Sequence, residues 1–368
     1  MAGSINNGAN LKADESGFNN GVSTDMVENG NGSNKAADVA AAPQHQSFWR
    51  KAWNHFKRFW WLYSILAILA IVLAVMLTIF VGVKNIAQSK INGAVLDVQG
   101  ISCTSTQTND FTLGINTTLK SGTTKATVQA FQGVMYLEDE PSQTPFVTID
   151  FPETQNMPFQ TVNISQHVQI ESIPALTTFN TWLLNNESLR VTVLGYPKVK
   201  VPGISKTYGV TFKKTITMPG LNGFAGLSVT NSSISISNFS DGTNFHTTAT
   251  IPNKSLVTFE IGNVTFNTYL NGSLIGNSYI NNVLLAPGNN TFAFRSSIQQ
   301  TPVLAAVQSE PWCQTGIVPM DLSGKSVENN GQPLAYFADA LASHNTTVQL
   351  DLGTPLRALG LNPKCPSS

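Results

Sequence analysis

Residues 257–294 read VTFEIGNVTFNTYLNGSLIGNSYINNVLLAPGNNTFAF, and this stretch decides how the chain folds. Apolar residues such as Val257 and Phe259 alternate with polar ones, which is the period of a strand with one buried and one solvated face. The dipeptide Asn271-Gly272 interrupts the alternation. It is typical of a type I′ turn, because both central residues of that turn need positive φ. The stretch therefore predicts antiparallel strands joined by tight turns.

The same alternation occurs elsewhere beyond residue 90, for example in Leu189, Val191 and Val193. Turn-forming sequences at 219–223 and 287–290 separate these runs. The predicted fold class of this part of the chain is therefore mainly β.

Two segments of this region have helical spacing instead, 176–183 and 334–341. A shift of 158 residues superposes six residues in order: Leu176 on Leu334, Phe179 on Phe337, Leu183 on Leu341, Leu194 on Leu352, Gly195 on Gly353 and Pro197 on Pro355. This match predicts an internal duplication. We expect two tandem β-sandwiches, at 92–219 and 224–368, each with one short helix.

The run Leu62–Val83 holds 22 residues without a charge. At about 1.5 Å per residue, a helix of this length is roughly 33 Å long and crosses a bilayer core of about 30 Å. A cleaved signal peptide is shorter and begins nearer the N-terminus, whereas 61 residues precede this run. The sequence therefore predicts a single transmembrane helix over 62–83.

Basic residues are unequally distributed about this span. Arg50, Lys51, Lys57 and Arg58 precede it, and Lys84 and Lys90 follow it. The larger cluster predicts a cytosolic N-terminus, a signal anchor and a lumenal or extracellular C-terminal region, which is a type II topology.

The cytosolic part has two predicted segments. Residues 1–47 are rich in Asn and Gly and poor in branched apolar side chains, so we expect a disordered tail. Residues 48–61 form a basic amphipathic juxtamembrane segment. Its four basic residues either bind anionic lipid at the membrane surface or are the ordinary positive flank of a signal anchor.

Ten Asn-x-Ser/Thr sequons follow the span: Asn116, Asn163, Asn186, Asn231, Asn238, Asn253, Asn263, Asn271, Asn289 and Asn345. A chain rich in Asn, Ser and Thr yields some sequons by accident, yet a lumenal location predicts glycosylation of most of them. Of Cys103, Cys313 and Cys365, the last two lie in the same unit and are the better disulfide pair.

Catalytic motifs are absent from the sequence: it has no Gly-x-Ser-x-Gly, no phosphate-binding Gly-rich loop and no His-Glu-x-x-His. We therefore expect no enzyme activity, cofactor or metal. Lys and Arg together equal Asp and Glu at 21 each, and no basic stripe lies outside the membrane flank, so nucleic acid is not an expected partner.

Two stretches resemble known families. Residues 250–294 combine Pro-Asn, alternating strands, Asn-Gly then Ile-Gly, and Pro-Gly-x-Asn. They resemble the late embryogenesis abundant (LEA) type-two domain. SLRVTVLGYPKVKVPGI through MPGLNGF, at 188–224, is similar to the lumenal domain of fungal single-span vacuolar membrane proteins. The resemblance implies immunoglobulin- or fibronectin-like sandwiches, residence in the vacuolar membrane, and a lipid-facing or scaffolding role.

Two functions remain open. The favoured one is a non-enzymatic membrane glycoprotein of the fungal vacuolar membrane, or alternatively of the cell surface, whose β-rich region scaffolds or binds other lumenal proteins. The second is a lipid-binding module with an apolar cavity between its sheets. A continuous apolar cleft would favour the second function.

Overall fold

The computed structural model describes residues 48–120, 125–155, 157–362 and 365. The predicted disordered tail, 1–47, lies outside these residues. The chain divides into two compact units, 1–67 and 68–368, and each is described by itself.

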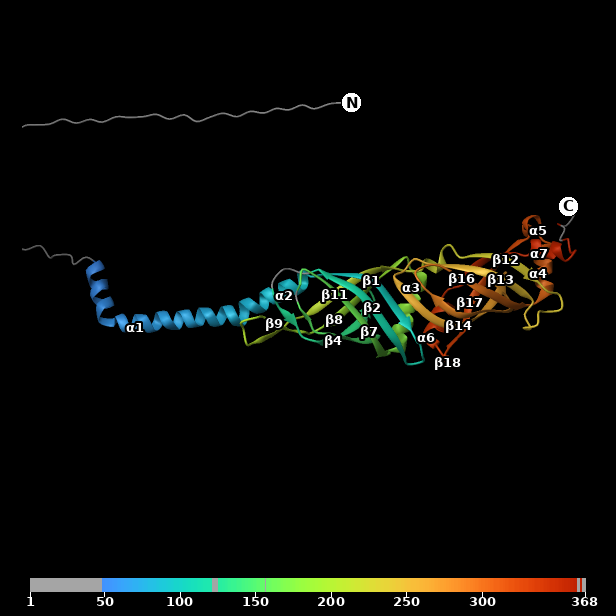
Figure 1. Ribbon diagram of the computed structural model, residues 1–368. Helices are drawn as coiled ribbons and strands as arrows, with labels where there is room; N and C mark the ends of the chain where they lie inside the picture. The colour runs from blue at the N-terminus through green and yellow to red at the C-terminus, as the bar shows by residue number, and fades with distance from the viewer. Residues whose placement is uncertain (1–47, 121–124, 156, 363–364, 366–368) are drawn as a thin grey trace, which may run out of the picture. The chain divides into compact units, whose positions relative to one another are not determined.

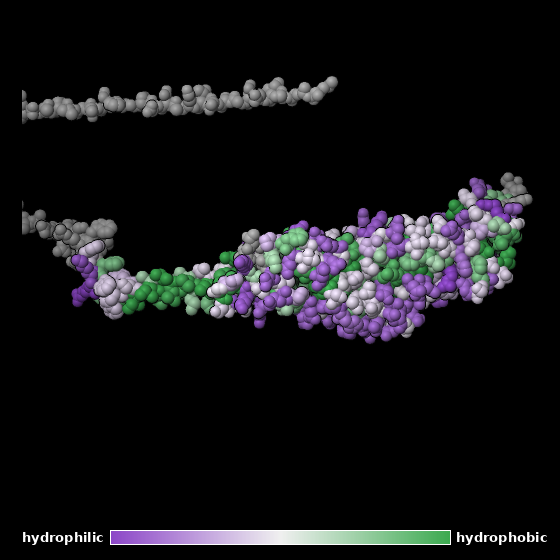
Figure 2. Space-filling view, viewed as in Figure 1, coloured by the Kyte–Doolittle hydropathy of each residue, from purple (hydrophilic) through white to green (hydrophobic). Residues whose placement is uncertain are grey.

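The N-terminal part of the described chain is helical. The helices are α1 (Phe48–Leu77), the π-helical turn η1 (Thr78–Gly82) and α2 (Val83–Gly93). Within the first unit, Phe59 departs from helical geometry, and the rings of Phe56 and Tyr63 stack 4.3 Å apart. Among the described residues, one helix is long and apolar enough to span a membrane. Its apolar side chains are exposed, as Figure 2 shows in green.

The second unit is built around an eleven-stranded sheet (Figure 1). Its strands are β1 (Val95–Thr104), β2 (Asp110–Lys120), β7 (Phe159–Gln169), β12 (Ser228–Ile234), β13 (Phe245–Asn253), β14 (Val257–Leu270), β15 (Ser273–Leu285), β16 (Gly288–Ile298), β17 (Ile317–Asn329), β18 (Gln332–Pro333) and β19 (Thr346–Asp351). The main path runs β12-β13-β16-β15-β14-β1-β2-β7, and β17 pairs with β14, β18 and β19.

Two smaller sheets have four strands each, and the strands of one follow the same spatial order as their neighbours in sequence do in the other. One is β11 (Phe212–Pro219), β8 (Ser188–Gly195), β4 (Phe131–Leu137) and β5 (Val147–Phe151). The other is β10 (Thr207–Gly209), β9 (Lys198–Lys200), β3 (Thr127–Val128) and β6 (Thr154–Gln155). Each strand of one sheet is separated from its counterpart in the other by only a few residues, so together they form one interrupted ribbon. Pro152 and Pro197 stand at two of the interruptions, where proline lacks the N–H that a ladder needs.

Both predicted short helices are present: 176–183 lies within α3 (Ile173–Asn185), and 334–341 overlaps α6 (Ala335–Ala342), which begins one residue later. They pack against each other, and Asn185 donates a hydrogen bond to Ser343, which stands 158 positions later. That is the shift on which the predicted duplication rests, but the superposition of the two halves remains a prediction. Four further short helices were not expected: η2 (Asn222–Phe224), α4 (Gln300–Val307), α5 (Trp312–Thr315) and α7 (Gly353–Ala358).

The prediction of a mainly β chain, with one long apolar helix ahead of a β-sandwich-like domain, is confirmed. The two expected repeats nevertheless share a sheet, because β1 pairs in parallel with β14 through Ile101–Val257 and Cys103–Phe259. This pairing covers a strand edge that separate sandwiches would expose. The boundary at 219–224 is therefore a position in the chain rather than a gap between two bodies.

The predicted hairpin is also found. Strands β14 and β15 are antiparallel, Leu270 pairs with Ser273, and Asn271 and Gly272 have φ values of 50° and 75°. Both central residues thus have the positive φ that a type I′ turn requires.

Candidate functional site

The second unit contains an apolar cavity of about 270 Å³, and residues of α2 are part of its lining. One wall is the inner face of β1, β2 and β7, with Leu96, Val98, Ile115, Leu119, Val162 and Ile164. The opposite wall is the interrupted ribbon, with Val128, Phe131, Phe151, Val193, Val199 and Phe212. The cavity therefore lies between two β layers.

The ribbon's interruption shapes the inner end of this wall. Phe131 stacks on Phe151 at 4.9 Å between ring centroids, and Phe212 lies 5.5 Å from Phe131. Gly195 at the end of β8 leaves room for this cluster, because a Cβ atom there would lie 2.7 Å from the Phe131 ring. The three aromatic rings thus lie where the strands of the ribbon are interrupted.

Helix α2 covers the outer end of the cavity. Its Ala87 is buried with Val199 and Val210 in a small second core. Gln88 fixes the helix by two hydrogen bonds of 2.8 Å: its Nε2 donates to the Thr211 carbonyl, and its Oε1 accepts from the Thr211 N–H. The cavity therefore adjoins the helix that continues from the predicted membrane span.

Lysine contacts strengthen this attachment. The Nζ of Lys214 donates to the carbonyl oxygens of Asn92 at 2.9 Å and Ala94 at 2.5 Å, and burial lowers the pKa of this amine. The Nζ of Lys206 lies 3.5 Å from the ring centroid of Phe80, which is a cation–π contact. The β region and the helix from η1 onward are thus held together at several points.

Ile101 and Met135 form the inner boundary of the cavity. Both residues also line a second, smaller cavity of about 40 Å³, which Cys103 and Tyr336 border as well. Burial raises the pKa of the Cys103 thiol, which is a free cysteine, to about 12, and this disfavours the thiolate form. The Tyr336 hydroxyl donates to the Gln107 carbonyl at 2.8 Å. The lining of both cavities is thus mainly apolar.

The predicted glycosylation sites divide into two groups. Nine of the asparagines are exposed: Asn116, Asn163, Asn186, Asn231, Asn238, Asn263, Asn271, Asn289 and Asn345. Asn116 and Asn163 are register partners on neighbouring strands β2 and β7.

Asn253 does not fit the prediction. Its side chain is buried, with 3% exposed, and its Nδ2 donates to the carbonyls of Val257 at 2.8 Å and Leu285 at 3.1 Å. Its Oδ1 accepts from the N–H and the hydroxyl of Ser255. The Asn253 side chain holds the β13–β14 connection together, so a glycan on its Nδ2 is incompatible with this fold. The sequon pattern alone carries no information on burial.

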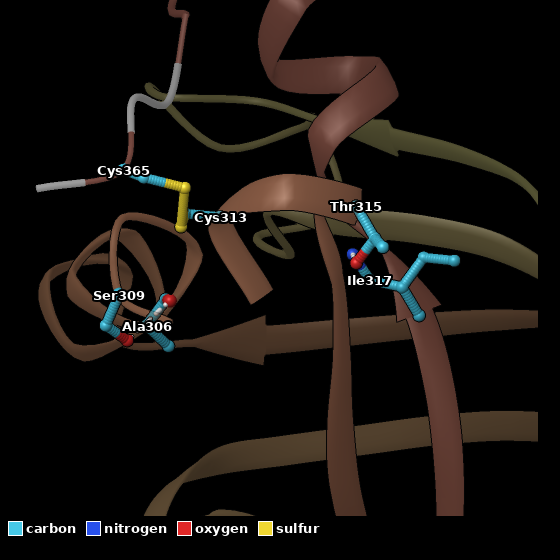
Figure 3. Close-up of a disulfide and its surroundings, with 6 residues drawn as sticks. All are labelled: Ala306, Ser309, Cys313, Thr315, Ile317 and Cys365. Atoms are coloured by element: carbon cyan, nitrogen blue, oxygen red, sulfur yellow. Dashed lines mark hydrogen bonds between the residues drawn. A yellow bond between two sulfur atoms is a disulfide. The ribbon is translucent and has the colours of Figure 1, made fainter. Parts of the chain in front are cut away.

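The other predicted site residues are placed as follows. Cys313 in α5 and Cys365 form a disulfide with their Cα atoms 5.1 Å apart (Figure 3). Lys57 and Arg58 are exposed, whereas the side chains of Arg50 and Lys51 lie outside the described part of the structure. Within the described residues, no group of three His, Cys, Asp or Glu side chains could hold a metal ion.

The cavity itself was not predicted residue by residue. Its lining residues come from ten strands, α2 and the connecting segments, and most of them look like ordinary core residues in the sequence. The only hint in the sequence was the pair of prolines at 152 and 197. They indicate where the strand hydrogen bonding is interrupted, but they do not indicate that a cavity lies next to the interruption.

Comparison with known proteins gives one family match. The model described as "Protein of unknown function (DUF3712)" matches residues 144–268, about a third of the chain. This segment includes β5 to β13 and most of β14. No curated protein matches the chain.

Several solved structures are distantly similar. A protein from Archaeoglobus fulgidus is 7% identical with a TM-score of 0.21, covering 34% of this chain and 94% of its own. A putative LEA protein is 10% identical with a TM-score of 0.24, covering 43% and 90%. The CupB6 tip adhesin from Pseudomonas aeruginosa is 6% identical with a TM-score of 0.18, covering 63% and 94%. Similarity at this level says nothing about ligand or activity.

Proposed function

We propose that this chain is a membrane-anchored, non-enzymatic lipid-binding module, whose cavity takes the apolar chain of a lipid. The apolar cavity of about 270 Å³ beside α2 is the observation that carries the proposal. It favours this function over a purely scaffolding one, because a scaffold has no need of an internal apolar space. Partner binding by the outer faces is compatible with it.

The cavity has the size for such a ligand. A cavity of about 150 Å³ lined by apolar side chains admits benzene, so one of about 270 Å³ holds roughly ten carbon atoms. Each buried methylene contributes about 0.8 kcal/mol before the cost of immobilising the ligand. A chain of that length gives an appreciable net affinity.

The proposed topology places the cavity near the membrane from which a lipid ligand would come. With the N-terminus in the cytosol and a helix spanning the bilayer, the cavity lies on the lumenal or extracellular side, close to the leaflet. We also propose that the exposed sequons are glycosylated, because that compartment is the one in which such sites are modified. Residence in the fungal vacuolar membrane is proposed from the sequence resemblance alone, with the plasma membrane as the alternative.

Photo-crosslinking of the full-length protein tests the proposal. The chain is purified in a neutral detergent, incubated with a long-chain alcohol that carries a diazirine on its tail, irradiated and digested for mass spectrometry. We expect labelled peptides from β2, β7 and β8 as well as from the span. Labelling confined to the span would contradict the proposal.

A matched pair of variants locates the label. Val162→Phe places a larger side chain in the cavity, whereas Thr161→Phe adds the same ring on the exposed face of the same strand. Labelling of the cavity peptides falls in the first variant and persists in the second. Equal labelling of both variants would place the probe elsewhere.

A further inference from the structure

The mouth of the cavity differs chemically from its walls. Polar groups enter the lining there, through Lys90 of α2 and through Thr154 and Gln155 of β6. Lys90 is exposed, and it is the single charged residue among the described residues that line the cavity. An apolar space with one cation at its opening matches a molecule with an apolar tail and an anionic head.

We infer that the cavity binds a single-chain anionic amphiphile, with its tail between the sheets and its head group at Lys90. This inference rests on the proposed lipid-binding function and adds the chemical class of the ligand. The space for roughly ten carbon atoms suits one chain rather than two.

Three further exposed lysines are next in the chain to lining residues of the cavity. Lys125 precedes the lining residue Ala126, and Lys198 and Lys200 stand on either side of the lining residue Val199. In β9 the exposed, buried, exposed pattern turns Val199 inward and both lysines outward. We call Lys90, Lys125, Lys198 and Lys200 the lysine rim.

The rim lysines are available for a ligand. Lys213 is paired with Glu138 at 3.0 Å, and Lys214 is bonded to two carbonyls of the α2 end. In contrast, no carboxylate within the described residues forms a salt bridge with any of the four rim lysines. The rim therefore has positive charge that the protein does not neutralise by direct pairing.

The surrounding sequence adds little negative charge. Residues 191–219 contain five lysines and no Asp or Glu, and α2 contains Lys84 and Lys90 and no acid. Three acidic residues are next to lining residues: Asp97, Asp150 and Glu153. Of these, Asp97 forms a salt bridge with Lys120 at 3.7 Å. The four rim lysines outnumber the two of these carboxylates that form no salt bridge within the described residues, Asp150 and Glu153, and this positive balance favours an anion at the opening.

Three probes with the same diazirine-bearing chain test the inference on the full-length protein in neutral detergent. Their heads are a phosphate, a hydroxyl and a trimethylammonium group. For each probe, the label on cavity peptides is divided by the label on the span, which corrects for partition into the micelle. We expect the phosphate probe to exceed the alcohol about fivefold, the order of one exposed charge pair.

Two lysine variants assign the head group. Lys90→Gln is expected to remove the preference for phosphate and to leave alcohol labelling unchanged. Lys325→Gln, an exposed lysine of β17 that donates to Asn277, serves as the control and keeps the preference. Added salt reduces the preference in the unmodified chain, because exposed charges are screened.

The outcomes separate the two proposals. Equal phosphate and alcohol labelling, a preference for the cationic probe, or a phosphate preference that survives Lys90→Gln overturns the anionic-ligand inference but leaves lipid binding intact. Absence of cavity labelling by all three probes overturns both.

Discussion

The disulfide between Cys313 and Cys365 gives the most quantitative prediction. It closes a loop across 52 residues and attaches the C-terminal segment to α5 (Figure 3). The loop-entropy relation assigns about 4 kcal/mol to a loop of this length at 25 °C. If roughly 280 residues unfold together, each with an unfolding entropy of about 2.1 cal/mol/K, the Tm shift is the lost free energy divided by the summed entropy. Removal of the disulfide is therefore expected to lower the Tm by about 7 °C.

The perturbation is Cys365→Ser, with Cys313→Ser and the double variant beside it. Thermal unfolding of the full-length protein is followed by circular dichroism with and without reductant. All three variants are expected to lose the same stability, because each removes the same link, and reductant lowers only the Tm of the unmodified protein.

Two results would refute this reasoning. A Tm for Cys365→Ser within 1 °C of the unmodified protein would mean that the link does not constrain the unfolded chain. A loss in Cys313→Ser alone would assign the effect to packing around this buried side chain.

Four further predictions concern other parts of the second unit. Mass spectrometry after deglycosylation will find Asn253 unoccupied, and Asn253→Ala will cost about 1–3 kcal/mol because buried carbonyls lose their donor. In denaturant titrations, Gly262→Ala will lower the free energy of unfolding more than Gly272→Ala. Both positions have positive φ, which costs an alanine about 1–2 kcal/mol. In addition, a Cβ atom at Gly262 would lie 2.5 Å from the Glu328 carbonyl oxygen, whereas a Cβ atom at Gly272 would have open space around it. Hydrogen bonds from Thr243, and then from Arg295, lower the pKa of Asp241 to about 2. The ionised carboxylate therefore stabilises the fold above about pH 4, and this contribution to the free energy of unfolding is lost as the pH falls to 2. In Asp241→Asn this part of the pH dependence of stability should be absent. Met135→Ala will cost about 2–5 kcal/mol and, by joining the two cavities, will shift crosslinking toward longer probe chains.

Each of these four predictions has a contrary result. A glycan on Asn253, equal costs for the two glycine variants, an unchanged acid profile in Asp241→Asn, or an unchanged chain-length preference in Met135→Ala would contradict the corresponding argument.

Local patterns of sequence predicted the strands, the hairpin and the anchor. The β14–β15 hairpin depends on alternation over a dozen residues and on the φ preferences of Asn271 and Gly272, which act within the turn itself. The span depends on length and composition, which need no distant contact.

Burial of individual polar residues was beyond such patterns. Asn253 has the same sequon as Asn271, yet one is a core residue and the other a turn tip. The difference arises because Asn253 bonds to Leu285, 32 residues away, and such partners are unknown until the strands pair.

The shared sheet and the cavity were decided by tertiary structure alone. The parallel pairing of β1 with β14 joins residues about 156 positions apart, and no local propensity specifies such a contact. The cavity lies where the ribbon breaks and the facing sheet continues. The lysine rim brings together lysines that are distant in the sequence, because residues of α2, β3 and β9 line the same cavity. The sequence alone determined which segments become strands and which segment is apolar enough to span a membrane. Packing decided where the strands leave space, because an empty volume depends on side chains that meet only in the folded chain.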